Sequence, residues 1–173
     1  MNMALRVQAF IERMTAAAGT VVQVATRDDV VNAVTCYREA LSLRGPVAVS
    51  PALADLVWPA HWPAAIGGAS DWHELSVAQA DLGIADTGSV LMASSPQSPN
   101  TLHFLPEHEV VCLDVNQVVV TLKEALSRFG AGNMPRAVNL LTGPSRTADV
   151  EQTIQLGAHG PRTLHVVIHS SQR

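Results

Sequence analysis

The chain has 173 residues, 47% of them hydrophobic and 15% charged, so it can bury a substantial core and is neither disordered nor fibrous. Its net charge of −4 argues against a nucleic-acid binder, because phosphate contacts require clustered Lys and Arg. Its two cysteines cannot by themselves hold an all-cysteine iron–sulfur cluster or a closed structural zinc site. The sequence has no apolar stretch of about 20 residues and no pattern of a signal peptide, so no membrane span and a cytoplasmic setting are expected.

The first 50 residues predict helices and strands in alternation. Apolar spacing predicts a helix over 3–18 that ends at Gly19, and a short β-branched strand follows over 20–25. Thr26 is expected to cap a second helix, and residues 47–50 form the next strand. The expected buried stripe of the second helix is Val30, Val34, Tyr37 and Leu41. This strand–helix–strand order predicts an α/β protein with a parallel sheet.

Residues 51–73 contain all three tryptophans, Trp58, Trp62 and Trp72. A short helix is expected over 51–57, and a loop follows it. Tryptophans in such a segment either line a ligand site or cover one edge of the core. The sequence leaves both interpretations open.

Two further strands are expected within 76–95, joined by a tight turn at Asp86, Thr87 and Gly88 that is typical of a hairpin. Asp86 is the candidate acidic catalyst, because it is the only acid in a glycine-bracketed turn between apolar strands. The alternative is that Asp86 only forms local hydrogen bonds in the turn. The polar, proline-rich segment 94–101 that follows is either a mobile surface loop or a lid.

A strand is expected over 109–115, and a helix after it. Thr121 and Glu124 fit a capping box that opens this helix, and Gly130 closes it. The side chains that it is expected to bury are Leu122, Leu126 and Phe129.

The stretch over 140–169 predicts a strand, a tight loop, a helix and a second strand. A helix that begins at Thr147 would present its unpaired amides and the positive end of its dipole to an anion. Arg146 adds a guanidinium suited to carboxylate or phosphate, and Ser145 or Thr147 can act as the N-cap. The loop therefore predicts a site for a small anion. The alternative is a well-capped helix whose Arg146 is tied to a neighbouring carboxylate.

The histidines do not predict a metal site. His165 and His169 lie four apart on an expected strand, about 13 Å from each other, which is too far to share one ion. His159 lies at the expected end of the helix that begins at Thr147, where a cation also suits the helix dipole. Phosphate-binding glycine motifs and the nucleophile elbow of the α/β-hydrolases are absent from the sequence.

Three segments together resemble the LUD domain, the family of lactate utilisation protein C. They are 83–90 (GIADTGSV), 104–115 (FLPEHEVVCLDV) and 143–165 (GPSRTADVEQTIQLGAHGPRTLH). The last is the most specific, because it is a long composite pattern. In this family the first segment usually reads GIAETG, so Asp86 stands where glutamate is usual and its carboxylate reaches one methylene less far.

The resemblance implies a three-layer α/β/α fold with a mostly parallel sheet, similar to the NagB/RpiA/CoA-transferase superfamily, in one LUD domain over 1–173. Such folds bind ligands beyond the carboxyl ends of the strands, where the 143–147 loop is expected to lie. It also implies a part in the oxidation of L-lactate to pyruvate with two iron–sulfur protein companions. The alternatives are a stand-alone isomerase or transferase with Asp86 as base or nucleophile, and a non-catalytic interaction subunit. The expected ligand-binding residues are Thr87, Gly88, Gly143, Ser145, Arg146, Thr147 and His159.

Overall fold

The computed structural model describes residues 1–67, 72–130, 134–147, 155–156 and 160–170. Its helices are α1 (Met3–Ala16), α2 (Val30–Ala40), α3 (Thr101–Phe104) and α4 (Leu122–Ser127), with 3-10 turns η1 (Pro51–Leu53) and η2 (Val115–Gln117). Its strands are β1 (Thr20–Gln23), β2 (Val47–Val49), β3 (Ala64–Ile66), β4 (Leu75–Gln79), β5 (Leu82–Ile84), β6 (Ser89–Ala93), β7 (His108–Asp114), β8 (Val118–Val119), β9 (Val138–Leu141), β10 (Arg146–Thr147), β11 (Gln155–Leu156) and β12 (Thr163–His169). None of the described helices is long and apolar enough to cross a membrane.

A six-stranded parallel sheet forms the centre of the molecule. Its strand order is β1-β12-β7-β4-β2-β3, and every neighbouring pair runs parallel. The inner strands β7 and β12 are buried along almost their whole length, as expected for a sheet covered on both faces. The predicted α/β fold with a mostly parallel sheet is therefore confirmed.

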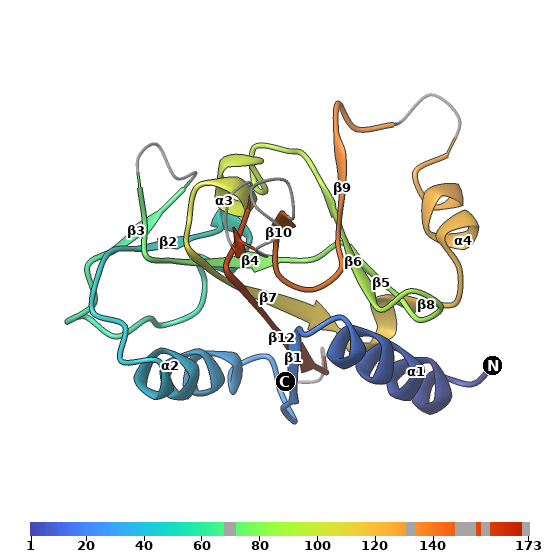
Figure 1. Cartoon of the computed structure of the whole chain (residues 1–173), viewed down its shortest axis with the longest axis horizontal. Coiled ribbons are helices and arrows are strands. Elements are labelled where there is room, and N and C mark those ends of the chain that lie inside the picture. The colour runs from blue at the N-terminus through green and yellow to red at the C-terminus, as the bar shows by residue number, and fades with distance from the viewer. Residues whose placement is uncertain (68–71, 131–133, 148–154, 157–159, 171–173) are drawn as a thin grey trace.

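Different elements cover the two faces of this sheet. Val30 and Val34 of α2 pack with the side chains of one face, among them Val110 and Val167. Helix α1 packs on the other face, where the second, smaller sheet contributes to the same core. Figure 1 shows α1 and α2 along the lower side of the view and the smaller sheet to the right.

The smaller sheet has four strands in the order β8-β5-β6-β9. Strands β5 and β6 pair antiparallel, so the hairpin predicted around Asp86 is confirmed. The prediction of only two strands within 76–95 is wrong, since this range contains three. Strand β4 belongs to the parallel sheet, and the chain passes to the smaller sheet at Asp81, whose Oδ2 accepts a hydrogen bond from the Ala93 amide.

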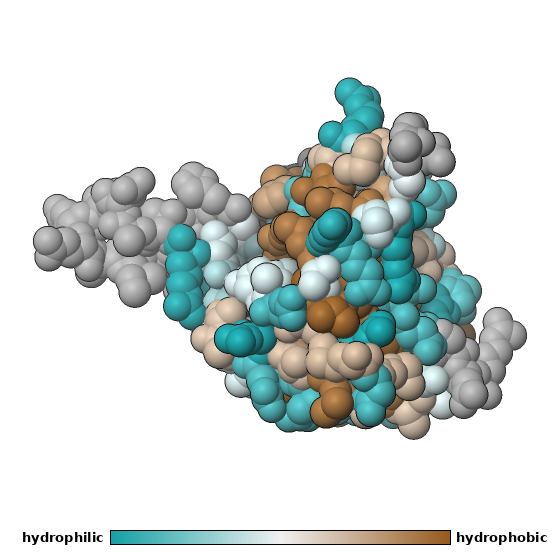
Figure 2. All heavy atoms as spheres, turned by 90° about the vertical axis from the view of Figure 1, so that its right-hand side faces the viewer, coloured by the Kyte–Doolittle hydropathy of each residue, from teal (hydrophilic) through white to brown (hydrophobic). Residues whose placement is uncertain are grey.

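The predicted cap of α4 is confirmed, but the predicted cap of α2 is wrong, because α2 begins at Val30 after Asp29 and the Thr26 hydroxyl donates to the Asp29 carboxylate instead. Some side chains that were predicted to be buried are exposed. Thr121 Oγ1 accepts from the Glu124 amide, which confirms the cap of α4. Leu122 and Leu126 are each 38% exposed, and Ala125 is the buried residue of the helix. Figure 2, which faces the side at the right of Figure 1, shows apolar atoms among polar ones on this surface.

The set of buried side chains on α2 also differs from the prediction at the C-terminal end of the helix. Leu41 is 42% exposed, because α2 ends one residue before it. Arg38 is buried instead, with its guanidinium 4.8 Å from the Trp62 ring centre and a hydrogen bond from Nη2 to the Gly45 carbonyl. A charged head that stacks on an aromatic ring and binds a carbonyl can occupy a position that spacing assigns to an apolar residue.

The predicted helix start at Thr147 is wrong, and residues 148–154 and 157–159 of the predicted helix lie outside the described residues. Arg146 and Thr147 form β10, which pairs antiparallel with Leu156 and Gln155 of β11. The Ser145 amide, expected at the start of that helix, donates to the Pro161 carbonyl at 2.8 Å. Ser and Thr side chains bond to nearby backbone in turns as well as at helix starts, so their presence does not by itself predict a helix.

Candidate functional site

The two glycine-containing motifs singled out from the sequence converge on the end of α1. Gly88 and Gly143 both have left-handed backbone, with φ of +67° and +76°. A Cβ built on Gly143 would lie 2.1 Å from the Ala17 carbonyl oxygen, and one on Gly88 would lie 2.3 Å from the Met14 backbone nitrogen. Both glycines therefore allow a close approach of backbone to α1.

A chain of hydroxyl groups joins the hairpin turn to the loop before Gly143. Thr87 Oγ1 lies 2.8 Å from Ser89 Oγ, which lies 2.5 Å from Thr142 Oγ1. Asp86 is exposed next to this chain, and its amide donates to the Val120 carbonyl. The structure thus brings the turn around Thr87 and Gly88 close to Gly143.

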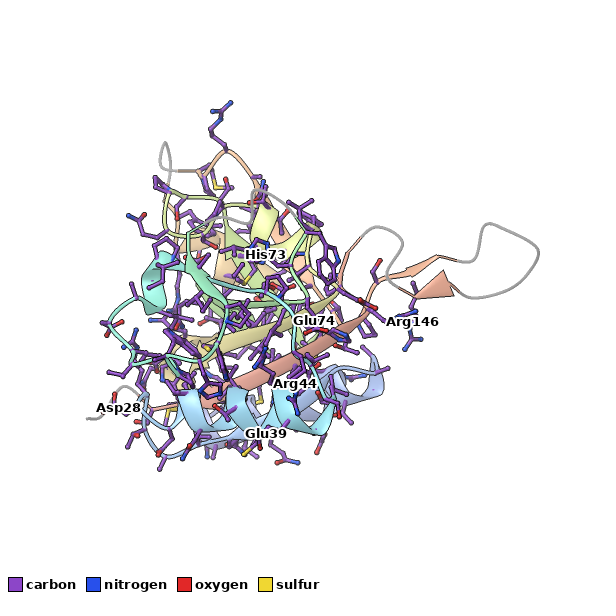
Figure 3. All side chains as sticks on the ribbon, turned by 90° about the vertical axis from the view of Figure 1, so that its left-hand side faces the viewer. Asp28, Glu39, Arg44, His73, Glu74 and Arg146 are labelled. Carbon is purple, nitrogen blue, oxygen red and sulfur yellow. The ribbon has the colours of Figure 1, made fainter. Side chains whose placement is uncertain are left out.

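Arg146 is exposed on β10, and Figure 3 shows it at the outside of the main body. Its Nη2 lies 3.4 Å from the Ala17 carbonyl oxygen at the end of α1. A guanidinium in this place suits the negative end of the helix dipole. Thr147 follows it in β10, and His159 lies outside the described residues.

The 143–147 loop lies at the amino edge of the parallel sheet. Ser145 binds Pro161, which precedes β12, and Gly143 packs on Ala17, which precedes β1. The prediction that this loop lies beyond the carboxyl ends of the strands is wrong. The reason is topological, because the loop leads from the smaller sheet toward the start of β12, and parallel strands all start at one edge.

The carboxyl edge of the sheet carries a different set of polar residues around a cavity of about 410 Å³. Its walls come from the ends of β4, β7 and β12 and from the segments that follow β1 and β2. The lining residues are Arg27, Ala52, Gln79, Ala80, Asp81, Asp114, Gln117 and His169. In an α/β fold this edge is where ligands bind.

His169 is the most distinctive side chain of this cavity. It is the last residue of β12, and only 3% of its surface is exposed. Its Nδ1 lies 3.3 Å from the Ser170 carbonyl oxygen, whereas Nε2 is buried without a hydrogen-bond partner in the described part of the chain. A buried polar atom that lacks a partner costs about 1–3 kcal/mol, so a ligand that binds Nε2 would remove this cost.

Charged groups of both signs surround His169. Burial raises the pKa of Asp81, although the Ala93 amide that donates to this carboxyl acts in the opposite direction. Asp114 Oδ1 accepts from the Asn116 amide at 2.8 Å. Arg27 is paired with Asp55 through both terminal nitrogens, and this hydrogen bonding raises its pKa. The cavity therefore offers an imidazole, a carboxyl group that retains its proton more readily than usual, and a fixed cation.

The sequence contains a signal for this cavity that the motif analysis missed. Gln79, Asp114 and His169 each end a strand whose interior is mainly apolar, and strands β4, β7 and β12 are neighbours in the sheet. Polar residues in these positions meet at one edge of a parallel sheet. The spacing of His165 and His169 in the sequence bears only on whether they could share a metal ion. Among the described residues, no group of three His, Cys, Asp or Glu side chains could hold a metal ion.

Two of the three tryptophans, Trp58 and Trp62, cover an edge of the core, which is one of the two interpretations that the sequence leaves open. Trp62 is 7% exposed and packs in the core beneath α2. Trp58 lies with its ring centre 6.0 Å from that of Trp62 and donates from Nε1 to the Leu53 carbonyl. Trp72 is 55% exposed.

Comparison with known proteins gives consistent results. The chain is 37% identical over 90 residues to the uncharacterized protein NMB1437 of Neisseria meningitidis. This alignment covers 51% of this chain and 39% of that protein. It is 28% identical over 127 residues to lactate utilization protein C of Geobacillus kaustophilus. This alignment covers 64% of this chain and 53% of that protein. YkgG of Escherichia coli is 32% identical over 101 residues, covering 55% and 44%. The chain thus spans about half the length of the curated relatives it matches, or less.

A solved structure shows the same fold. The crystal structure of a DUF162 family protein from Deinococcus radiodurans aligns with a TM-score of 0.75 at 16% identity, over 98% of this chain and 99% of that one. The model of the LUD domain matches residues 66–169, which include both glycine motifs and all of β12. The chain belongs to the LUD domain family.

Proposed function

We propose that this chain binds a small carboxylate- or phosphate-bearing molecule and takes part in the oxidation of L-lactate to pyruvate. Iron–sulfur protein companions in the cytoplasm would carry the electrons, since a chain with two cysteines has no set of its own for a four-cysteine cluster. The proposal treats residues 1–173 as one LUD domain. Several relatives carry the name lactate utilization protein C, which supports this role.

The observation that carries the proposal is the buried Nε2 of His169 at the carboxyl edge, which has no hydrogen-bond partner among the described residues and belongs to a side chain lining the cavity. Oxidation of a 2-hydroxy acid to a 2-keto acid releases the hydroxyl proton, the proton on Cα and two electrons. The His169 imidazole can act as the base for the hydroxyl proton, and Asp81 lines the same cavity as a second acid–base group. The two electrons would pass to a partner protein or a bound cofactor.

Replacing His169 with phenylalanine is expected to weaken the binding of L-lactate or pyruvate about 5-fold, because one hydrogen bond worth about 1 kcal/mol is lost while the ring volume stays similar. Isothermal titration calorimetry with each compound measures this change. Replacing His61, which is exposed and away from the cavity, with phenylalanine is the control and should leave the affinity unchanged. Equal affinities of the wild type and the His169 variant would contradict the proposed site.

A second candidate anion site is the 143–147 loop predicted from the sequence. Arg146 is exposed there and forms no ion pair with a carboxylate in the described part of the chain. Arg146→Ala is then expected to weaken the binding of inorganic phosphate by about 1.5–3 kcal/mol, the value of a hydrogen bond to a charged group. Calorimetry measures the affinity, and the exposed Arg136→Ala is the matched control. A lower melting temperature with unchanged phosphate affinity would assign Arg146 to the cap of α1 instead.

A further inference from the structure

A row of three side chains, away from the cavity at the carboxyl edge, has the order of a nucleophile, a base and an acid. Ser98 Oγ lies 3.4 Å from His103 Nε2, and His103 Nδ1 lies 2.6 Å from Glu109 Oε1. The two contacts use the two ring nitrogens of one imidazole. This is the arrangement that activates a serine hydroxyl on several unrelated folds.

Burial makes this row different from a surface cluster. Glu109 is fully buried, His103 is 1% exposed and Ser98 is 7% exposed. Glu109 Oε2 is buried without a partner in the described part of the chain, so the carboxyl group acts there on His103 alone. A carboxylate in such surroundings fixes the ring orientation of the imidazole and stabilises the cation that forms when Nε2 takes a proton.

The fold holds each member in place. Glu109 is the second residue of β7, and His103 lies on α3, which packs against the neighbouring strand β4. Ser98 belongs to the proline-rich segment between β6 and α3. Its backbone pairs with Ser95 in both directions, and Ser50 Oγ donates to the carbonyl of Gln97. The backbone on both sides of the serine is therefore held in place.

We propose that Ser98, His103 and Glu109 form a serine-nucleophile site that hydrolyses small activated esters. Ser98 Oγ bonds to the acyl carbon and its proton passes to His103 Nε2, which gives it to the departing alcohol as the ester bond breaks. Water then attacks the acyl-serine and gives one proton to His103, which returns it to Ser98 as the carboxylic acid leaves. The net reaction is ester plus water to acid plus alcohol. Ser98 and His103 are the catalytic residues, and Glu109 is a positioning residue.

Reaction with a fluorophosphonate tests the nucleophile in the full chain. The phosphorus is expected to bond to Ser98 Oγ with loss of fluoride, and mass spectrometry of the digested protein locates the adduct. Ser98→Ala should lose the adduct, whereas Ser127→Ala, at an exposed serine of α4, should keep it. No adduct on the wild-type protein, or an adduct on any other residue, would overturn the proposal without reference to a variant.

The rate of the same reaction tests the positioning role of Glu109. Glu109→Gln is expected to slow phosphonylation on the order of 10³–10⁴-fold with an unchanged dissociation constant for the probe, as for the loss of the acid in other triads. Glu109→Asp should recover part of the rate. Equal rates for the wild type and a folded Glu109→Gln variant would remove Glu109 from the site. The result is independent of lactate or phosphate binding.

Discussion

Replacing Gly143 with alanine is expected to lower the free energy of unfolding by about 3 kcal/mol or more. Left-handed backbone costs a residue with a Cβ about 1–2 kcal/mol, and overpacking adds about 1–3 kcal/mol. Both apply here, because φ is +76° and the new Cβ would lie 2.1 Å from the backbone oxygen of Ala17. Backbone cannot rotate away as a flexible side chain can. Urea unfolding followed by circular dichroism measures the difference.

Gly130 provides a matched control for this substitution. Its φ is +69°, but a Cβ there would meet nothing within 4 Å. Gly130→Ala should therefore cost only about 1 kcal/mol, the conformational part. If the two variants lose the same free energy of unfolding, the close approach of Gly143 to α1 adds nothing to the cost of the alanine substitution. A clear difference would show that the motif around Gly143 is required for the fold, whatever ligand it binds.

The parallel sheet could be predicted because its central strands carry an unambiguous signal. Residues 110–113 and 164–168 are almost uninterrupted apolar runs, and a strand buried on both faces requires this pattern. The capping box of Thr121 and the hairpin at Asp86 were predictable for a similar reason, since each depends on hydrogen bonds within a few residues. Local chemistry decides such features before any long-range contact forms.

The region after Gly143 could not be predicted in the same way. Ser145, Arg146 and Thr147 suit a helix start, but their backbone groups bind Pro161 and residues of β11, which lie 8 or more positions away in the chain. The prediction of which side chains of α4 are buried fails for a related reason. Leu122 and Leu126 have helical spacing, yet α4 presents only Ala125 to the core of the smaller sheet. Which face of a short helix is covered depends on tertiary packing.

The candidate site was predicted only in part. The motifs around Thr87 and Gly143 do come together, but at the amino edge of the sheet. His169 and Asp81 were missed as partners because they lie 88 positions apart and share no motif. Strand order brings them to one edge, and the order of strands in a parallel sheet is not written in any single segment.

His165 is expected to make the protein sensitive to mild acid. Burial lowers its pKa from 6.5 to about 4, and its ring stacks on Tyr37 with a hydrogen bond between Nδ1 and Thr20 Oγ1. A lowered pKa in the folded state means that stability is fully present above pH 6.5 and is lost as the pH falls toward 4, because the unfolded chain takes up the proton first. At a pH of about 4.5 the loss is about 2.5 kcal/mol.

His165→Phe should remove this loss, since phenylalanine keeps the stack on Tyr37 but has no proton to bind. The variant is expected to be less stable than the wild type at neutral pH, where it lacks the hydrogen bond to Thr20, and to lose less stability on acidification. Burial raises the pKa of Asp81 and Glu109 and lowers that of His108, and these groups titrate in both proteins. The difference in unfolding free energy between the two proteins, measured in urea at neutral pH and again near pH 4.5, therefore isolates His165. Parallel losses in both proteins would mean that the His165 ring takes up its proton in the folded state as easily as in water.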